Sequence, residues 1–317
     1  MGSRFLVLPF SLLTILAPAG ISRSVVSQVP QKSLEGALKG IITSEYAWQD
    51  FARVQRKCRF EILRADLAAS EAEFGADPED MRPFEIRLER QITYTSEQAR
   101  DPQLMARLKQ QAQAEIDKQA KAALEARRNK LISRGLVLLD ENNVTVDLGK
   151  LWRWNLKRMQ PHARRLAASA NPKDPPARAA LAFVQEIPYR KPPDERAGRC
   201  TFGFLPPLEA LAAGYGDCDT KSLLFASLAD DGRGPEVILL RGPGHVVAGL
   251  ACSEKEKGTK VRAFGKTFLI CECSDGVWLP GEVSPEIQRD IESGLYKPLR
   301  LRKSGGEALR AEGLGVL

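Results

Sequence analysis

A cysteine in the C-terminal third of the chain has the setting of a catalytic nucleophile. Cys218 follows Gly216 and Asp217, and Asp217 is a natural N-cap, so we expect Cys218 in the first turn of a helix. The positive end of the helix dipole favours the thiolate, which is the nucleophilic form. The carboxylates of Asp217 and Asp219 oppose it, so a nearby cation must activate the thiol.

His245 is the candidate for that cation. The chain has two histidines, and the other, His162, lies in a predicted basic helix outside this region. His245 follows the turn 242–244 and opens an apolar strand, a place where active-site side chains often lie. A Cys–His pair supplies both an activated nucleophile and a general acid for the leaving group.

A carboxylate is needed to orient the imidazole. Glu272 ends an apolar strand, and antiparallel pairing of that strand with the one opened by His245 would bring the two side chains together. Asp275 is the alternative third member of a triad, but a strand end holds Glu272 more rigidly. Acyl transfer also needs an oxyanion donor, for which the Cys218 backbone N–H and the Gln185 side chain are candidates. Tyr215 is expected either to wall the pocket or to pack in the core.

The elements that must position these residues form a predicted domain at 177–290. We expect helices at 177–186, 208–213 and 218–230, then strands at about 235–240, 245–252 and 267–273. The pattern predicts an α+β fold in which the cysteine-bearing helix packs on a small antiparallel sheet.

The same segments resemble the transglutaminase-like core of exported bacterial cysteine peptidases. The resemblance rests on residues 183–189, 211–222, 244–246 and 271–278, about a third of the chain, and 145–166 resembles a lead-in of one exported subgroup. It implies a papain-like fold and a triad of Cys218, His245 and Glu272, although aspartate is the commoner acid. It also implies peptide or amide hydrolysis through an acyl-enzyme. Transamidation, which cross-links proteins, and a non-catalytic peptide- or wall-binding module are the alternatives.

No cofactor is expected, because a papain-like site needs neither a metal nor an organic group. The candidate residues lack the spacing of zinc ligands, and the six cysteines show no disulfide framework. Cys252, Cys271 and Cys273 are expected as buried strand residues, with a disulfide between two of them as the alternative. Alternation along a strand would place Cys271 and Cys273 on one face and Glu272 on the other.

The first 19 residues have the pattern of a signal peptide. Arg4 precedes an apolar run, and Ala17-Pro18-Ala19 predicts cleavage before Gly20, with an uncleaved anchor as the alternative. The run is shorter than a membrane span of about 20 residues. We therefore expect a periplasmic or secreted protein with no stable membrane span after cleavage. The net charge of +7 comes from basic residues mixed with acidic ones, which argues against nucleic-acid binding. A protein or peptide substrate is what the resemblance implies.

The region 20–140 is expected to be largely helical. Its clearest element is a helix at 102–134, with Asp101 as N-cap and Gly135 as the stop. This helix either packs along its own domain or binds a partner. Alternation predicts a strand at 84–94, whereas residues 47–62 fit helical and strand periods equally.

A lead-in at 141–176 connects this region to the predicted catalytic domain. A hairpin is expected to join 136–139 to 144–148, with asparagines in the turn. A basic helix at 151–168 follows, and Pro161 is expected to kink or split it. Prolines at 171–176 mark the domain boundary. The chain ends in a C-terminal tail at 291–317, and the part after Leu301 is expected to be loose.

Overall fold

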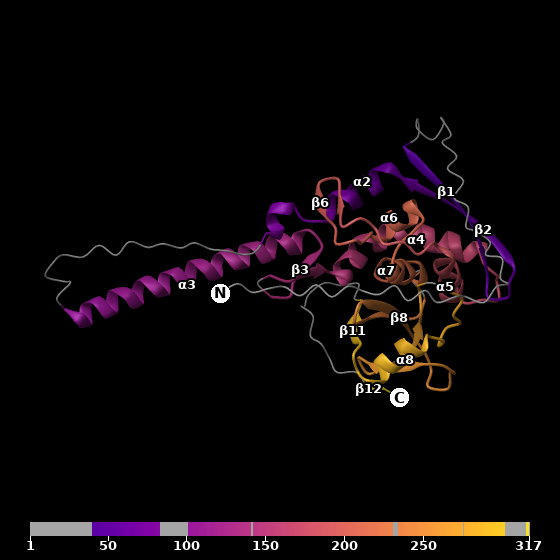
Figure 1. Cartoon of the computed structure of the whole chain (residues 1–317). Helices are drawn as coiled ribbons and strands as arrows, with labels where there is room; N and C mark the ends of the chain where they lie inside the picture. The colour runs from indigo at the N-terminus through magenta and orange to yellow at the C-terminus, as the bar shows by residue number, and fades with distance from the viewer. Residues whose placement is uncertain are drawn as a thin grey trace, which may run out of the picture.

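The structure of the chain is a computed structural model that describes residues 40–82, 101–140, 142–230, 234–274, 276–301 and 315–316. It combines helices with an antiparallel sheet, as the α+β prediction requires (Figure 1). The predicted signal peptide at 1–19, the strand at 84–94, Asp275 and most of the tail lie outside the described residues.

The N-terminal region opens with a hairpin, not with a helix. Strands β1 (Ile41–Gln49) and β2 (Gln55–Leu63) pair antiparallel along their full length. The period-two interpretation of this stretch is therefore the correct one. Its inward side chains are buried against helix α5 (Pro176–Glu186), where Tyr46 and Trp48 pack edge-on against Phe183. Helix α2 (Arg64–Glu73) and the short 3-10 helix η1 (Pro78–Met81) follow.

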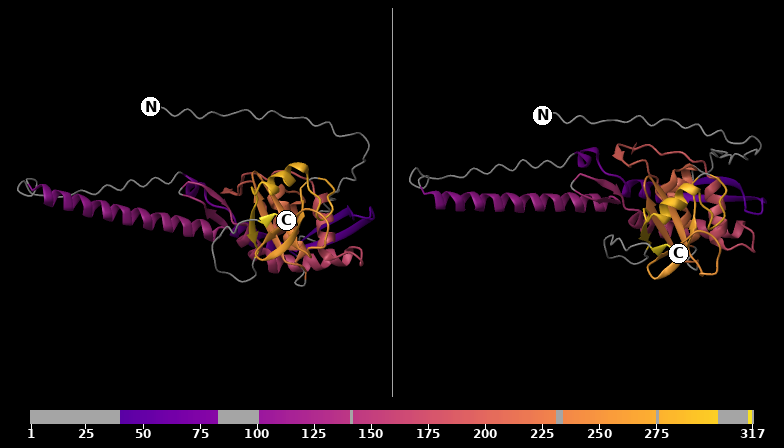
Figure 2. Two further views of the ribbon diagram at one scale, coloured as in Figure 1. Left: turned by 90° about the horizontal axis from the view of Figure 1, so that it is seen from below. Right: turned by 60° about the horizontal axis from the view of Figure 1, so that its bottom comes forward.

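Helix α3 (Pro102–Ser133) confirms the predicted long helix. The Asp101 carboxylate accepts hydrogen bonds from the backbone N–H groups of Gln103 and Leu104, and Gly135 has the positive φ of a helix stop. Its C-terminal end joins the core through the fully buried Leu131. The rest of the helix extends away from the body of the protein in all the views (Figures 1 and 2).

The lead-in forms as predicted, except at its proline. Strands β3 (Leu136–Leu138) and β4 (Val144–Val146) make the expected hairpin. Helix α4 (Leu148–Ser169) continues through Pro161 without being split. Met159, His162 and Leu166 are buried around the proline, so packing holds both halves of the helix on the same core.

Helix α7 (Cys218–Ala229) is the centre of the fold. Every residue of the helix after Asp219 is buried, which explains why the stretch 223–229 is apolar on all sides except at Ser227. Helices α4, α5 and α6 (Pro207–Ala213) pack around it, and the sheet covers its remaining side. Figure 1 shows these helices stacked above the sheet.

The sheet positions the histidine and the glutamate. Its order is β11-β7-β8-β10-β9-β12, and all neighbouring strands are antiparallel. One face packs on α7, and the other carries helix α8 (Pro285–Glu292) through Ile291 and Tyr296. The strands are β7 (Val237–Gly242), β8 (His245–Ala251), β9 (Lys260–Ala263), β10 (Lys266–Cys271), β11 (Lys297–Arg300) and β12 (Gly315–Val316). A two-stranded ribbon of β5 (Glu195–Arg196) and β6 (Arg199–Cys200) lies in the loop before α6.

Candidate active site

Cys218 is the first residue of α7, as the sequence predicted. The Asp217 side chain caps the helix by accepting from the Thr220 backbone N–H, 3.4 Å away. The thiol is nearly buried, with 8% of Cys218 exposed. Among the described residues, the backbone N–H of Cys218 has no acceptor, because a helix leaves its first N–H groups without partners.

A glycine holds the turn before Cys218 in place. A Cβ on Gly216 would lie 2.4 Å from the Thr220 Cγ2 atom, so no larger residue fits without displacing the helix start. The Gly216 backbone also bonds the segment after α5, since its N–H donates to Pro188 O and its carbonyl accepts from Arg190 N–H. These contacts fix Tyr189 beside Gly216, and Gly216 precedes Cys218 by two positions in the chain.

The acidic neighbour Asp219 is protonated more readily than the sequence suggested. Burial raises the pKa of Asp219 above its ordinary value, and the hydrogen bond and charge of Asp217 raise it further. A protonated Asp219 weakens the repulsion that opposes a thiolate at the helix start.

His245 and Glu272 form the predicted pair. The His245 Nε2 atom lies 3.1 Å from the Glu272 Oε2 atom, and the Glu272 side chain is almost fully buried. The other Glu272 oxygen accepts from the Ser274 backbone N–H at 2.8 Å. Both oxygens of the Glu272 carboxylate therefore have hydrogen-bond partners. The contact at Nε2 of His245 directs the other ring nitrogen, Nδ1, away from Glu272.

The two side chains stabilise each other's charge. Burial alone lowers the pKa of His245, but hydrogen bonding and charge from Cys218 and Glu272 outweigh it and raise this pKa to about 10. Burial alone raises the pKa of Glu272, yet the His245 contact and the bonds from Ser274 bring it below its ordinary value. Near neutral pH the site therefore contains an imidazolium beside a carboxylate, and Cys218 is close enough to contribute to that charge state.

A buried lysine ties together the segments that carry the site. Lys221, one turn after Cys218, is completely buried, and its Nζ donates to the backbone carbonyls of Ile187 and Ser274 at 2.8 and 2.9 Å. A third contact reaches the Gln185 carbonyl at 3.4 Å. The ammonium group thereby links α7, the end of α5 and the segment after Glu272. Sequence reasoning missed this role, because a lysine in an apolar helix carries no signal of its partners.

Gln185 has a bracing role in this structure. Its side-chain N–H₂ donates to the carbonyls of Glu272 and Trp278, at 2.7 and 2.9 Å, and its oxygen accepts from the Trp278 N–H. Both amide hydrogens are occupied, so Gln185 has none left for the predicted oxyanion. The side chain instead fixes the segment that follows Glu272.

Two tyrosines flank the cysteine. Tyr215 packs against the main core and carries the Arg190 guanidinium 3.4 Å from its ring centroid, so of its two expected roles packing is the one observed. Tyr189 was not singled out by the sequence. Burial, together with the charges and hydrogen bonding of Cys218 and its acidic neighbours, raises the pKa of Tyr189 to about 12. Its hydroxyl group is thus a protonated donor beside the sulfur.

The cysteines of the sheet lie on the face that the alternation predicted. Cys271 and Cys273 are completely buried in the core on the α7 side, and Glu272 lines a pocket on the α8 side. All six cysteines are free thiols, and Cys252 is partly exposed. The alternative of a disulfide among the strand cysteines is therefore absent from this structure.

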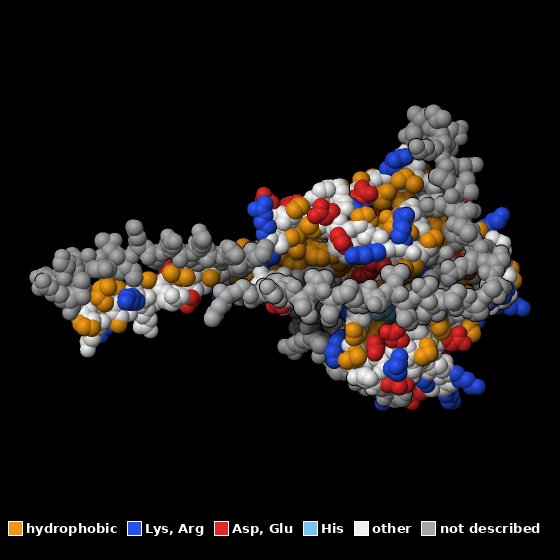
Figure 3. Space-filling model, in the orientation of Figure 1, with side chains coloured by type: hydrophobic (Ala, Val, Ile, Leu, Met, Phe, Trp, Pro, Cys, Tyr) orange, Lys and Arg blue, Asp and Glu red, His pale blue; other side chains and the backbone are white. Residues whose placement is uncertain are grey.

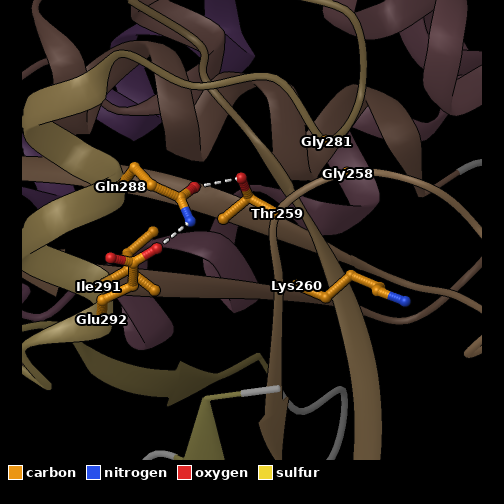
Figure 4. Close-up of a pocket in the computed structure, with 7 residues that line it drawn as sticks. All are labelled: Gly258, Thr259, Lys260, Gly281, Gln288, Ile291 and Glu292. Atoms are coloured by element: carbon orange, nitrogen blue, oxygen red, sulfur yellow. Dashed lines mark hydrogen bonds between the residues drawn. The ribbon is translucent and has the colours of Figure 1, made fainter.

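A pocket of about 330 Å³ adjoins the imidazole. It is lined by the turn Pro243–Gly244, by His245 and Glu272, and by residues from the segment 274–296. We call it the imidazole-side pocket. A second cavity of about 340 Å³ lies where α8 meets the loops around Gly258 and Gly281, and it contains none of the candidate catalytic residues (Figure 4).

Three further observations concern the described part of the chain. It contains no group of three or more His, Cys, Asp or Glu side chains that could hold a metal ion. None of its helices is long and apolar enough to cross a membrane. On the face shown in Figure 3, acidic and basic side chains are interspersed.

Comparison of the chain with protein-family models, with curated proteins and with solved structures gives no match.

Proposed function

We propose that this protein is a cysteine enzyme that cleaves a peptide or amide bond by acyl transfer through Cys218, His245 and Glu272. The observation that carries the proposal is the His245 imidazole, which bonds Glu272 on one side and is coupled to Cys218 on the other. This order of nucleophile, base and orienting acid is what acyl transfer requires. The transglutaminase-like resemblance of the sequence remains part of the proposal.

The reaction proceeds in two stages. In the first, the Cys218 thiolate attacks the carbonyl carbon and the imidazolium of His245 gives its proton to the leaving nitrogen, so that a thioester forms and an amine departs. In the second, His245 takes a proton from water, the resulting hydroxide attacks the thioester, and the acid is released as the carbon–sulfur bond breaks, which restores the Cys218 thiolate beside the His245 imidazolium. Glu272 keeps the ring oriented and stabilises its charge through both stages.

Two groups are placed to stabilise the oxyanion. The Cys218 backbone N–H has no acceptor among the described residues and points from the positive end of α7. The Tyr189 hydroxyl is protonated up to high pH and lies beside the sulfur. Together they replace the Gln185 amide that the sequence suggested.

The experiment compares wild-type protein with Cys218→Ala, using an alkylating thiol probe and a peptide library whose new ends are identified by mass spectrometry. We expect the variant to lose turnover by at least about 10³-fold, and to lose the rapid component of labelling. Cys200→Ala and Cys252→Ala are matched controls, because both thiols are partly exposed and lie outside the triad. Equal turnover by Cys218→Ala and wild type would refute the proposal.

Export of the protein belongs to the same proposal and rests on the sequence pattern of residues 1–19 alone. Comparing the mass of the mature protein with that of the full chain tests it. A mature protein that retains residues 1–19 would contradict cleavage.

A further inference from the structure

The imidazole-side pocket lies on the amine side of the reaction. Cys218 opens α7, which packs on one face of the sheet, whereas Glu272 and the pocket are on the opposite, α8 face; His245 lines the pocket and is coupled to Cys218. The imidazolium delivers its proton to the leaving nitrogen, so the part of the substrate attached to that nitrogen extends toward the ring. The pocket is therefore placed to receive the residue that follows the scissile bond.

The charged groups of this pocket are acidic. Glu272 is matched by His245, but Glu286 and Asp290 on α8 form no salt bridge and no side-chain hydrogen bond with any described residue. None of the residues that line the pocket is Lys or Arg. The lining thus presents two unmatched carboxylates to whatever enters.

The spacing of these two carboxylates is unfavourable for the helix itself. Glu286 and Asp290 are four residues apart, so they are neighbours on one face of α8, and like charges at that spacing destabilise a helix. Glu286 gains some compensation from the positive N-terminal end of α8, but Asp290 lies one turn further along. A cation in the pocket would relieve this repulsion.

Aromatic side chains complete the walls. Trp278 and Tyr296 line the pocket, and the Tyr296 ring is packed so closely on Gly242 that a Cβ there would lie 2.5 Å from it. Aromatic rings accept the alkyl part of a long side chain and attract a positive charge. The volume of about 330 Å³ is at the lower end of the range for small-ligand pockets, about 300–1,000 Å³, and suits one side chain.

From this arrangement we propose that the imidazole-side pocket selects substrates with a cationic side chain, Lys or Arg, on the amine side of the bond that is cleaved. The proposal rests on the proposed function, since it names the substrate class of the same site. The carboxylates of Glu286 and Asp290 bind the ammonium or guanidinium group, while the aromatic walls hold its alkyl chain.

The test begins with a peptide library digested by wild-type protein. We expect Lys and Arg to be enriched in the first two positions after the cleaved bond. The best peptide is then compared with analogues that carry norleucine or Glu at that position, and kcat/KM is measured for each. At low salt, we expect Lys to be preferred over norleucine by about 5- to 20-fold, from two ion pairs of modest strength. The preference should shrink as salt is added.

Variants of α8 locate the source of the preference. Glu286→Gln and Asp290→Asn are each expected to reduce the Lys-to-norleucine ratio of kcat/KM by about 2- to 5-fold. Glu292→Gln is the matched control, because Glu292 is on the same helix but lines the other cavity. Turnover without a cationic preference, or a preference unchanged in Glu286→Gln and Asp290→Asn, would overturn this proposal alone. No Cys218-dependent turnover of any peptide would instead overturn the proposed function.

Discussion

The charge state of His245 gives the sharpest test of the site. In Glu272→Gln the side chain keeps its size and an oxygen that can accept a hydrogen bond, but it loses the negative charge 3.1 Å from Nε2. The pKa of His245 is raised from 6.5 to about 10, which corresponds to roughly 5 kcal/mol in favour of the charged ring. Cys218 and Glu272 both raise this pKa while burial lowers it, so losing the Glu272 charge should remove at least half of the net preference. We expect the pKa of His245 to fall to about 8 or lower in the variant.

Histidine-selective ¹⁵N labelling makes this measurement simple, because the chain has only two histidines. Burial, helped by the charge of Arg165, lowers the pKa of His162 to about 4. Between pH 5 and pH 9 we therefore expect little titration of either ring in the wild-type protein, with one ring charged and the other neutral. In Glu272→Gln, the ¹⁵N signals of one imidazole ring should titrate within this range. These signals are assigned to His245 if they are missing from the spectrum of the His245→Gln protein.

The same change has a defined effect on stability. A pKa raised in the folded state contributes stability that is fully present below the unfolded value of 6.5 and is lost as the pH rises through about 10. In the Glu272→Gln protein, the contribution of His245 to the free energy of unfolding should be lost at a lower pH than in the wild type. Glu292→Gln is the control and should leave both the titration and the stability profile unchanged. A wild-type His245 that titrates near 6.5, or a titration unaffected by Glu272→Gln, would refute the ion pair.

Two further predictions concern the framework of the site. Lys221→Met leaves three buried backbone carbonyls without the ammonium group, so we expect a loss of about 2–4 kcal/mol in the free energy of unfolding, measured by urea denaturation, and slower labelling of Cys218. Gly216→Ala places a Cβ 2.4 Å from the Thr220 Cγ2 atom, so we expect a loss of about 1–3 kcal/mol by the same method, together with a lower kcat because the helix start shifts.

Each of these variants has a control in the same chain. Lys130→Met removes an exposed lysine whose ion pairs lie at the surface and are screened by solvent, so it should leave the free energy of unfolding almost unchanged. Gly149→Ala lies in helix α4, where the nearest atom to the new Cβ is 3.6 Å away, and should be neutral or stabilising by about 0.5–1 kcal/mol. If Lys221→Met were as mild as Lys130→Met, the bracing role of Lys221 would be wrong.

Most elements of the C-terminal region could be predicted because their signals are local. An N-cap aspartate and a glycine turn locate the start of α7, and apolar runs locate β7, β8 and β10. The hairpin of β1 and β2 could not be separated from a helix, because its inward residues satisfy both periods and only pairing with a second strand decides between them. The split that Pro161 could have caused does not occur, since the packing of α4 outweighs the local cost of the proline.

The sequence by itself determined which residues are able to do chemistry and in which elements they lie. Residue type and spacing suffice for Cys218 at a helix start, His245 at a strand start and Glu272 at a strand end. Only the tertiary structure decided their partners, because antiparallel register brings Glu272 to His245 and the packing of α7 brings Cys218 to the same edge of the sheet. It also assigned Gln185 and Lys221 to bracing and placed the carboxylates of α8 around a pocket. Such contacts join residues far apart in the chain, and local patterns do not encode them.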